Sequence, residues 1–269
     1  MTYYVSSGTL NSTNSTQLRI ILNRYADKLI TSQNQFGFKK HHSTAMCTMV
    51  LKQTINYYTA NKGRVFCTLL DATKAFERVK YCKLFQCLVD WNLPAVMLRV
   101  LYKLYTSQVM CVKWNGGQSR WFHAVNGVKQ GGVLSPVLFC IYLDGLLRTL
   151  CSSKIGCVVG TMFTGILAYA DDIALLAPTP LAMRCMLSIC EKYAAEFGVL
   201  FNATKSKCIV CTSRFSKTAQ DLSNYSKFTI SGNEIEFVQS WAHIVSSTMD
   251  DENDIARSRH NLIGKLMMF

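Results

Sequence analysis

The segment ILAYADDIALLAPT, from Ile166 to Thr179, places two adjacent carboxylates inside a run that is otherwise apolar. Ionised carboxylates are rarely buried unless something compensates their desolvation. The apolar residues on both sides predict two strands of a sheet, joined by a turn at Asp171 and Asp172. The sequence therefore predicts a buried sheet with acidic residues where its strands turn.

A third carboxylate, Asp71, ends the continuous apolar strand RVFCTLLD. If this strand neighbours those of the 166–179 segment, three carboxylates converge at one edge of the sheet. Such a cluster is unfavourable without cations and favourable with them. Hard oxygen ligands suit Mg²⁺, and two such ions about 3.5–4 Å apart form the clamp used for phosphoryl transfer. A hairpin whose turn simply contains two aspartates is the alternative.

The chain is strongly basic, with 29 Lys and Arg against 16 Asp and Glu and a formal net charge of +13. This excess favours a polyanionic partner, either nucleic acid or an acidic membrane surface. A basic protein without such a partner is the alternative on charge alone. No apolar run reaches the length of a membrane span, because the best candidate, residues 137–147, is short and interrupted by Asp144.

The cellular compartment is predicted from the N-terminus and the cysteines. The chain lacks a basic start followed by an apolar stretch, so we expect no signal peptide. The 12 cysteines are scattered among apolar neighbours, which is typical of reduced, buried thiols. We therefore expect a nuclear or cytoplasmic protein that is not secreted. Cys208 and Cys211 have C-x2-C spacing, but no second Cys or His pair stands at zinc-site spacing.

Hydrophobic periodicity predicts alternating helices and strands after a Ser/Thr/Asn-rich start that we expect to be disordered (residues 1–16). Asn115-Gly116 predicts the turn of a hairpin, Ser135-Pro136 the start of a helix, and Gly198 the end of another. The first predicted helix covers about 17–30, and a second follows the loop SQNQFGFKKHHST and ends near residue 61. Further helices are predicted at 84–92, 94–105, 135–150 and 183–197. Strands are predicted at KCIVCTS, KFTI and EIEFV. This order predicts an α+β domain with a mainly antiparallel sheet.

Five blocks of the sequence, taken together and in order, resemble the motifs of reverse transcriptases, most closely those of non-LTR retrotransposons. The blocks are QFGFKKHHST, LLDATKAFERV, GVKQGGVLSPVLF, AYADDIALLA and GVLFNATKSK. The resemblance implies an RNA-directed DNA polymerase shaped like a right hand, with RNA template, DNA primer and deoxynucleoside triphosphates as partners. It implies partial fingers at residues 17–63, a palm with an inserted fingers segment at 64–240, and a remnant of the primer grip and thumb at 241–269.

The resemblance also assigns catalytic roles. Asp71 and Asp171 would bind two Mg²⁺ ions, with Mn²⁺ as a substitute, and Asp172 would support them as a third metal ligand. These metals would activate the primer 3′-hydroxyl and stabilise the leaving pyrophosphate. Lys205 matches a lysine that approaches the pyrophosphate and could act as a general acid. A surface lysine is the alternative for Lys205.

Further residues are implied in substrate binding. Phe76, with Ala75 before it, matches an aromatic plate under the nucleotide sugar that would collide with a 2′-hydroxyl, although Phe76 could also be plain core. Gln130 and Gly131 match residues that lie against the incoming nucleotide and the template base. Lys39 stands where the family usually has an arginine and would contact template or triphosphate, although it lacks the bidentate fork of arginine.

Departures from the family pattern leave a second function open. The chain begins close to the QFGF block, and we expect little of a thumb after Trp241. The stretch FVQSWAHIVSSTMDDENDI resembles the primer grip of the family, but the expected Leu-Gly is absent after His243. The alternative is therefore a catalytically inactive, decayed or domesticated nucleic-acid-binding remnant. An intron-encoded maturase is disfavoured because no maturase-like segment follows.

Overall fold

The computed structural model describes residues 4–7, 24–25, 29–107, 109–115, 117–128, 132–212 and 227–238. The chain forms two compact units. Unit 1 comprises residues 1–31, 74–145 and 197–199, and unit 2 comprises residues 32–73, 146–196 and 200–269. The segment predicted as a primer-grip and thumb remnant, 241–269, lies outside the described residues, as does most of the helix predicted at 17–30.

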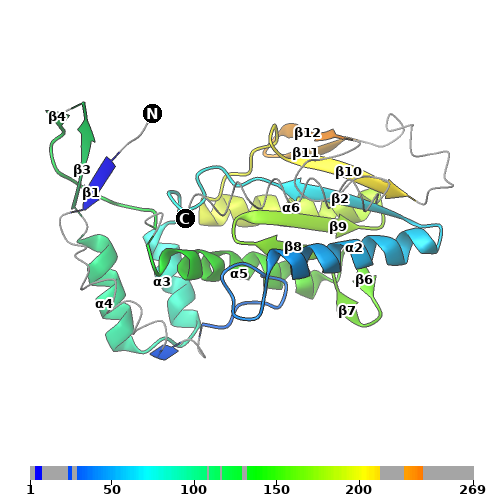
Figure 1. Cartoon of the computed structure of the whole chain (residues 1–269), viewed down its shortest axis with the longest axis horizontal. Helices are drawn as coiled ribbons and strands as arrows, with labels where there is room; N and C mark the ends of the chain where they lie inside the picture. The colour runs from blue at the N-terminus through cyan, green and yellow to red at the C-terminus, as the bar shows by residue number, and fades with distance from the viewer. Residues whose placement is uncertain are drawn as a thin grey trace. The chain divides into compact units, whose positions relative to one another are not determined.

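A six-stranded sheet forms the centre of unit 2 (Figure 1). The order is β11-β12-β10-β2-β9-β8, and every neighbouring pair is antiparallel except β10 with β12. The strands are β2 Arg64–Leu70, β8 Ile166–Tyr169, β9 Asp172–Ala177, β10 Lys207–Thr212, β11 Phe228–Ile230 and β12 Asn233–Phe237. The predicted α+β fold and the predicted strand-turn-strand around Asp171 and Asp172 are confirmed.

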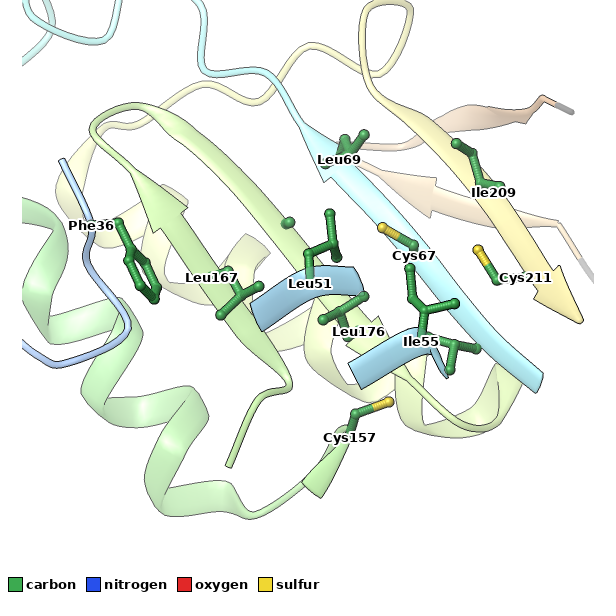
Figure 2. Packing of buried hydrophobic residues seen from close by; sticks show 12 residues of the cluster. Phe36, Leu51, Ile55, Cys67, Leu69, Cys157, Leu167, Leu176, Ile209 and Cys211 are labelled. Carbon is green, nitrogen blue, oxygen red and sulfur yellow. The ribbon is translucent and has the colours of Figure 1, made fainter. Parts of the chain in front are cut away.

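Helix α2, Thr44–Ala60, covers one face of this sheet. Its N-terminus is capped by Ser43, whose Oγ accepts a hydrogen bond from the Met46 amide at 3.2 Å. Leu51 and Ile55, one helical turn apart, are fully buried, and they belong to one apolar cluster with side chains of four strands (Figure 2). The strand members of this cluster are Val65, Cys67, Leu69, Leu167, Ala174, Leu176, Ile209 and Cys211. Their spacing of two residues shows that one face of each strand meets α2.

Helix α6, Pro180–Phe197, begins where Thr179 accepts a hydrogen bond from the Ala182 amide at 3.2 Å. The helix ends at Gly198, whose φ of +72° is the left-handed conformation expected at a helix C-terminus. Its buried side chains are Met183, Met186, Leu187, Cys190, Tyr193 and Ala194. Glu191 accepts a hydrogen bond from the Ser231 amide at 2.7 Å, which joins α6 to the turn between β11 and β12. A short hairpin, β6 Val158–Val159 and β7 Met162–Phe163, completes the described part of unit 2.

Unit 1 combines two helices with a small antiparallel sheet. The helices are α3 Tyr81–Asp90 and α4 Ala95–Thr106, and the strands are β1 Tyr4–Ser7, β3 Val109–Trp114, β4 Gly117–Gln118 and β5 Phe122–His123. β3 pairs with β4 across Asn115, as the sequence predicted, and also with β1 and β5. Tyr4–Ser7 therefore forms a strand, although we expected residues 1–16 to be disordered. No local sequence pattern predicts this pairing, because it joins segments about a hundred residues apart.

Helix α5, Ser135–Ser153, starts in unit 1 and ends in unit 2. Among the described residues it is the one helix long and apolar enough to cross a membrane. Of its most apolar stretch of 18 residues, 61% is buried inside the protein. Such burial also occurs in the core helices of folded domains. Asp144, which interrupts the apolar run of this helix, is 1% exposed, so it belongs to the interior.

Candidate active site

The pairing of β2 with β9 brings the acidic strand ends together. The last paired residues are Leu70 and Ile173, and β8 pairs with β9 up to Tyr169 and Asp172. Asp71 follows Leu70, and Asp172 precedes Ile173, so the antiparallel register carries both carboxylates to the same edge of the sheet. The prediction that the strand before Asp71 neighbours the strands of the 166–179 segment is confirmed.

The turn between β8 and β9 carries the other carboxylate. Ala170 has a φ of +58°, Asp171 is partly buried and Asp172 is exposed. Burial, followed by the negative charge of Asp172, raises the pKa of the Cys47 thiol to about 12. Cys47 lies on α2, so the Asp172 charge acts on the side of the sheet that α2 covers. Alternate residues of a strand share one face, and Ala174 and Leu176 of β9 belong to the cluster beneath α2. Asp172, two residues before Ala174, is therefore expected on that same face.

The segment after α6 is fixed against Asp71 by backbone hydrogen bonds. The Asp71 carbonyl accepts from the Asn202 amide at 2.9 Å, and the Asp71 amide donates to Ser206 Oγ at 3.1 Å. Between these two anchors, the Asn202 side chain accepts from the Lys205 amide at 3.3 Å. Lys205 Nζ consequently lies 3.9 Å from Asp71 Oδ2. The structure thus brings together two residues that the sequence predicted for one site.

The structure does not assemble the predicted three-carboxylate cluster. Among the described residues, no group of three or more His, Cys, Asp or Glu side chains stands close enough to hold a metal ion. Like charges repel one another without a cation between them, and an ammonium group already stands near Asp71. The donors nevertheless suit the implied Mg²⁺, because they are partly exposed carboxylate oxygens at adjoining strand ends.

Phe76 and Ala75 belong to unit 1. The Phe76 ring stacks on Phe139 of α5 with centroids 4.7 Å apart and an interplanar angle of 27°. The backbone of Phe76 accepts a hydrogen bond from the Val128 amide at 2.8 Å. Both Ala75 and Phe76 are half-buried, so part of each stays accessible. Gln130 and Gly131, which follow Val128 in the sequence, lie outside the described residues.

Lys39 lies in the loop before α2, and its Nζ donates to the Ser32 carbonyl at 3.2 Å. This hydrogen bond joins Lys39 to its own loop, and a contact of Lys39 with template or triphosphate stays a prediction. The cysteine pair lies elsewhere, on β10, where Cys211 belongs to the cluster beneath α2 and Cys208 does not. Residues three apart on a strand point to opposite faces, and burial raises the pKa of both thiols to about 12. This arrangement disfavours thiolate ligation of a metal by the pair.

The structure adds Gln35 to the residues around the turn that carries Asp171 and Asp172. Its side chain is fully buried and hydrogen-bonded to Ala170, the residue immediately before Asp171. The sequence contained a signal, since Gln35 opens the QFGF block. A single glutamine in a loop carries no pattern of its own, however, and sequence reasoning did not select it.

The chain is similar to proteins of a known family. A model of the family described as reverse transcriptase (RNA-dependent DNA polymerase) matches residues 10–239. The Pol polyprotein of the type-2 retrotransposable element R2DM from Drosophila melanogaster is 33% identical over 136 residues, 51% of this chain and 13% of that protein. The R2 Pol polyprotein of Nasonia vitripennis is 26% identical over 217 residues, 81% of this chain and 21% of that protein. The chain thus spans about a fifth or less of these two relatives.

Solved structures agree on the fold. Apo telomerase from Candida tropicalis matches with a TM-score of 0.56 and 11% identity, covering 88% of this chain and 40% of that chain. Telomerase from Candida albicans, in complex with a fragment of telomeric RNA, matches with a TM-score of 0.53 and 14% identity, covering 77% and 35% respectively.

The sheet, its covering helices and the acidic strand ends define an α+β polymerase palm. The chain belongs to the reverse transcriptase family, and its curated relatives are of the non-LTR retrotransposon kind that the five sequence blocks resemble.

Proposed function

We propose that this chain is the domain of a retrotransposon protein that carries out RNA-directed DNA synthesis by metal-dependent nucleotidyl transfer. The observation that carries the proposal is the register of β2 with β9, which ends at Leu70 and Ile173 and leaves Asp71 and Asp172 at one sheet edge. Bound cations would compensate the negative charge of the carboxylates that gather where this apolar sheet ends.

The residues of this edge have separate tasks in the proposal. Asp71 and Asp171 would hold the two Mg²⁺ ions, and Asp172 would support them. Bound Mg²⁺ supplies Lewis acidity that lowers the pKa of the primer 3′-hydroxyl and neutralises charge on the triphosphate. Lys205, which lies 3.9 Å from Asp71, holds a proton on Nζ that it can give to the leaving oxygen.

Substrate binding follows from charge and from Phe76. The net charge of +13 favours a nucleic-acid template and primer, which this family uses. The structural relative from Candida albicans is described in complex with RNA. The Phe76 ring, backed by Phe139, is rigid enough to exclude a 2′-hydroxyl, so the nucleotides are deoxynucleoside triphosphates.

The second candidate function is nucleic-acid binding without catalysis. It is favoured by the lack of an assembled three-carboxylate group among the described side chains. Binding requires only the basic surface, whereas a reacting group misplaced by about 1 Å can cost on the order of 100-fold in rate.

Primer extension separates the two functions. The chain is incubated with a poly(rA) template, an oligo(dT) primer, dTTP and either Mg²⁺ or Mn²⁺. Asp71→Asn and Asp171→Asn remove one charge each at the proposed site, and Asp90→Asn, at the exposed end of α3, is the matched control. Extension by the unmodified chain and by Asp90→Asn, with loss in both other variants, supports the polymerase. Salt-sensitive RNA binding with no extension under either metal supports the second candidate.

A further inference from the structure

The loop before α2 forms an additional backbone partner for β8. Its contacts centre on Ala168, whose carbonyl accepts from the Phe36 amide at 2.7 Å and whose amide donates to the Asn34 carbonyl at 2.8 Å. Gln35 and Ala168 form an isolated parallel bridge. Since β8 is the edge strand of the sheet, this loop covers an edge that would otherwise be open.

The Gln35 side chain extends from this loop to the turn between β8 and β9, where Ala170 precedes Asp171. Its Oε1 atom accepts hydrogen bonds from the Ala170 amide at 3.0 Å and from the Gly37 amide at 2.9 Å. Its Nε2 atom donates to the Ala170 carbonyl at 3.4 Å. The final β8–β9 pair is Tyr169 with Asp172, so Ala170 lies beyond the ladder. The amide of one side chain therefore contacts both backbone polar groups of a residue that the sheet does not pair.

Ala170 needs such support because its backbone is strained. Its φ of +58° lies in the left-handed region, which residues with a Cβ atom seldom adopt. The backbone of Gly37, in the same loop, approaches Ala170 so closely that a Cβ atom at position 37 would lie 2.5 Å from the Ala170 nitrogen. That neighbour is backbone and cannot rotate away. The loop and the turn are thus fitted to each other at two points.

We propose that Gln35 is a positioning residue for the metal-binding carboxylates: by holding Ala170 in its left-handed conformation, it sets the direction in which Asp171 and Asp172 leave the turn. The proposal rests on the proposed function, because it takes these carboxylates as metal ligands. Gln35 is fully buried, so it acts through the backbone of Ala170 and contacts neither nucleotide nor primer.

The chemistry of the side chain suits this task. A carboxamide offers an acceptor and a donor at one end, and Ala170 presents an amide and a carbonyl to match. Glutamate at position 35 would lose the donor and would add a buried negative charge close to Asp171. Methionine has a similar length and volume but makes neither hydrogen bond, which makes Gln35→Met the informative variant.

Amide hydrogen exchange tests the bridge without metal or substrate. In the unmodified chain, the Ala170 amide should exchange slowly, as a hydrogen-bonded amide does, although it lies outside the β8–β9 ladder. In Gln35→Met its exchange should be about tenfold faster, while amides in the middle of β2 and β9 stay unchanged. Gln53→Met makes the same substitution on the exposed side of α2 and should behave as the unmodified chain.

A Mn²⁺ titration, followed by the electron paramagnetic resonance signal of the free ion, tests the positioning role. Partners that orient metal ligands typically change metal affinity by about 10- to 100-fold when removed. We expect a weakening of that size in Gln35→Met and none in Gln53→Met. Asp71→Asn in the same titration reports on the proposed metal site itself, so failure of that site and failure of the Gln35 proposal give different results.

Each outcome is decisive. Faster exchange at Ala170 together with weaker Mn²⁺ binding supports the proposal. Unchanged exchange, or faster exchange with unchanged Mn²⁺ affinity in a protein whose affinity does respond to Asp71→Asn, overturns it. If Gln35→Met does not fold, Gly37→Ala provides the second variant, since its methyl group should displace the same turn and weaken Mn²⁺ binding. Rapid exchange of the Ala170 amide in the unmodified chain would also overturn the proposal.

Discussion

Lys205 Nζ lies 3.9 Å from Asp71 Oδ2, and both side chains are open to solvent, with exposed fractions of 67% and 34%. Such an exposed pair contributes little to stability, about 0–1 kcal/mol. Its placement follows from the backbone instead: the turn from Asn202 to Ser206 is hydrogen-bonded to the backbone of Asp71, which holds the backbone of Lys205 beside this carboxylate.

Lys205→Met should lower the rate of nucleotide addition with little effect on thermal stability. Loss of a general acid typically costs about 10²- to 10⁴-fold in rate, and Lys205→Arg should recover only a part, because guanidinium releases its proton far less readily. Pre-steady-state primer extension measures this rate. Lys227→Met removes a similarly exposed lysine, paired with Glu234, and should leave the rate unchanged. Equal rates for Lys205→Met and the unmodified chain would identify Lys205 as a surface residue.

The position of the Asp172 charge can be tested through the reactivity of the Cys47 thiol, whose pKa it raises. Burial and the Asp172 charge together raise the pKa of Cys47 to about 12, and burial and the Asp90 charge raise that of Cys87 to about 11. Removing a negative charge lowers the thiol pKa, so more thiolate is present at a given pH. Asp172→Asn should therefore speed alkylation of Cys47 by roughly threefold, which corresponds to about half a pKa unit.

The same experiment contains its own control. Asp90→Asn should speed alkylation of Cys87 and leave Cys47 unchanged, whereas Asp172→Asn should do the reverse. Mass spectrometry of labelled peptides at pH 8 measures both thiols in one sample. If the two variants changed both thiols equally, general loosening of the fold would be the cause, and the position of Asp172 on the α2 side would lose its support.

Much of the sheet could be predicted because its signals are local. The apolar runs at 64–70 and 166–177, the Ser135-Pro136 helix start and the glycine after α6 each predicted an element that the structure contains. That Asp71 lies near the turn at Asp171 and Asp172 was expected from the resemblance to a family whose palm has this topology. Position along the chain alone could not establish it.

What could not be predicted depends on contacts between distant segments. The pairing of Tyr4–Ser7 with β3 has no local signature, and a Ser/Thr-rich start reads as disordered. Gln35 is important because it reaches Ala170, 135 residues away, and a left-handed alanine is not visible in a sequence. The burial of Asp144 depends on what packs around α5, which no local pattern shows.

The buried thiols predict a loss of stability in alkaline solution. Burial raises the pKa of Cys157, Cys208 and Cys211 to about 12, against 9.0 for a free thiol. Between pH 9 and 12 the unfolded chain has therefore lost protons that the folded chain keeps, and the free energy of unfolding falls as pH rises. Each such thiol contributes up to about 1.4 kcal/mol per pH unit in this range.

Urea midpoints at pH 7, 8, 9 and 10, under reducing conditions, measure this slope. Lysines and tyrosines also titrate there, so the informative quantity is the difference between variants. Cys211→Val replaces the thiol by an apolar side chain that cannot ionise and should flatten the slope above pH 9. Cys82→Ser, at an exposed cysteine, should leave it as it is. Identical slopes in both variants would mean that Cys211 titrates normally in the folded chain.

Phe76 should select the sugar of the incoming nucleotide. Its ring stacks on Phe139 at 4.7 Å, which leaves it little freedom to move away from a 2′-hydroxyl. Phe76→Val removes the ring, so the ratio of deoxynucleotide to ribonucleotide incorporation should fall by at least about tenfold. Loss of the stacked pair should also lower stability by about 1–3 kcal/mol, because Phe76 is half-buried.

Single-nucleotide incorporation with dTTP and UTP, in an active protein, gives the ratio, and thermal unfolding gives the stability. Phe122→Val, at an exposed ring of the same unit, should change neither quantity strongly. A Phe76→Val protein that loses stability while its ratio stays constant would show that the ring serves only the packing of unit 1, and sugar selection would then have to come from another residue.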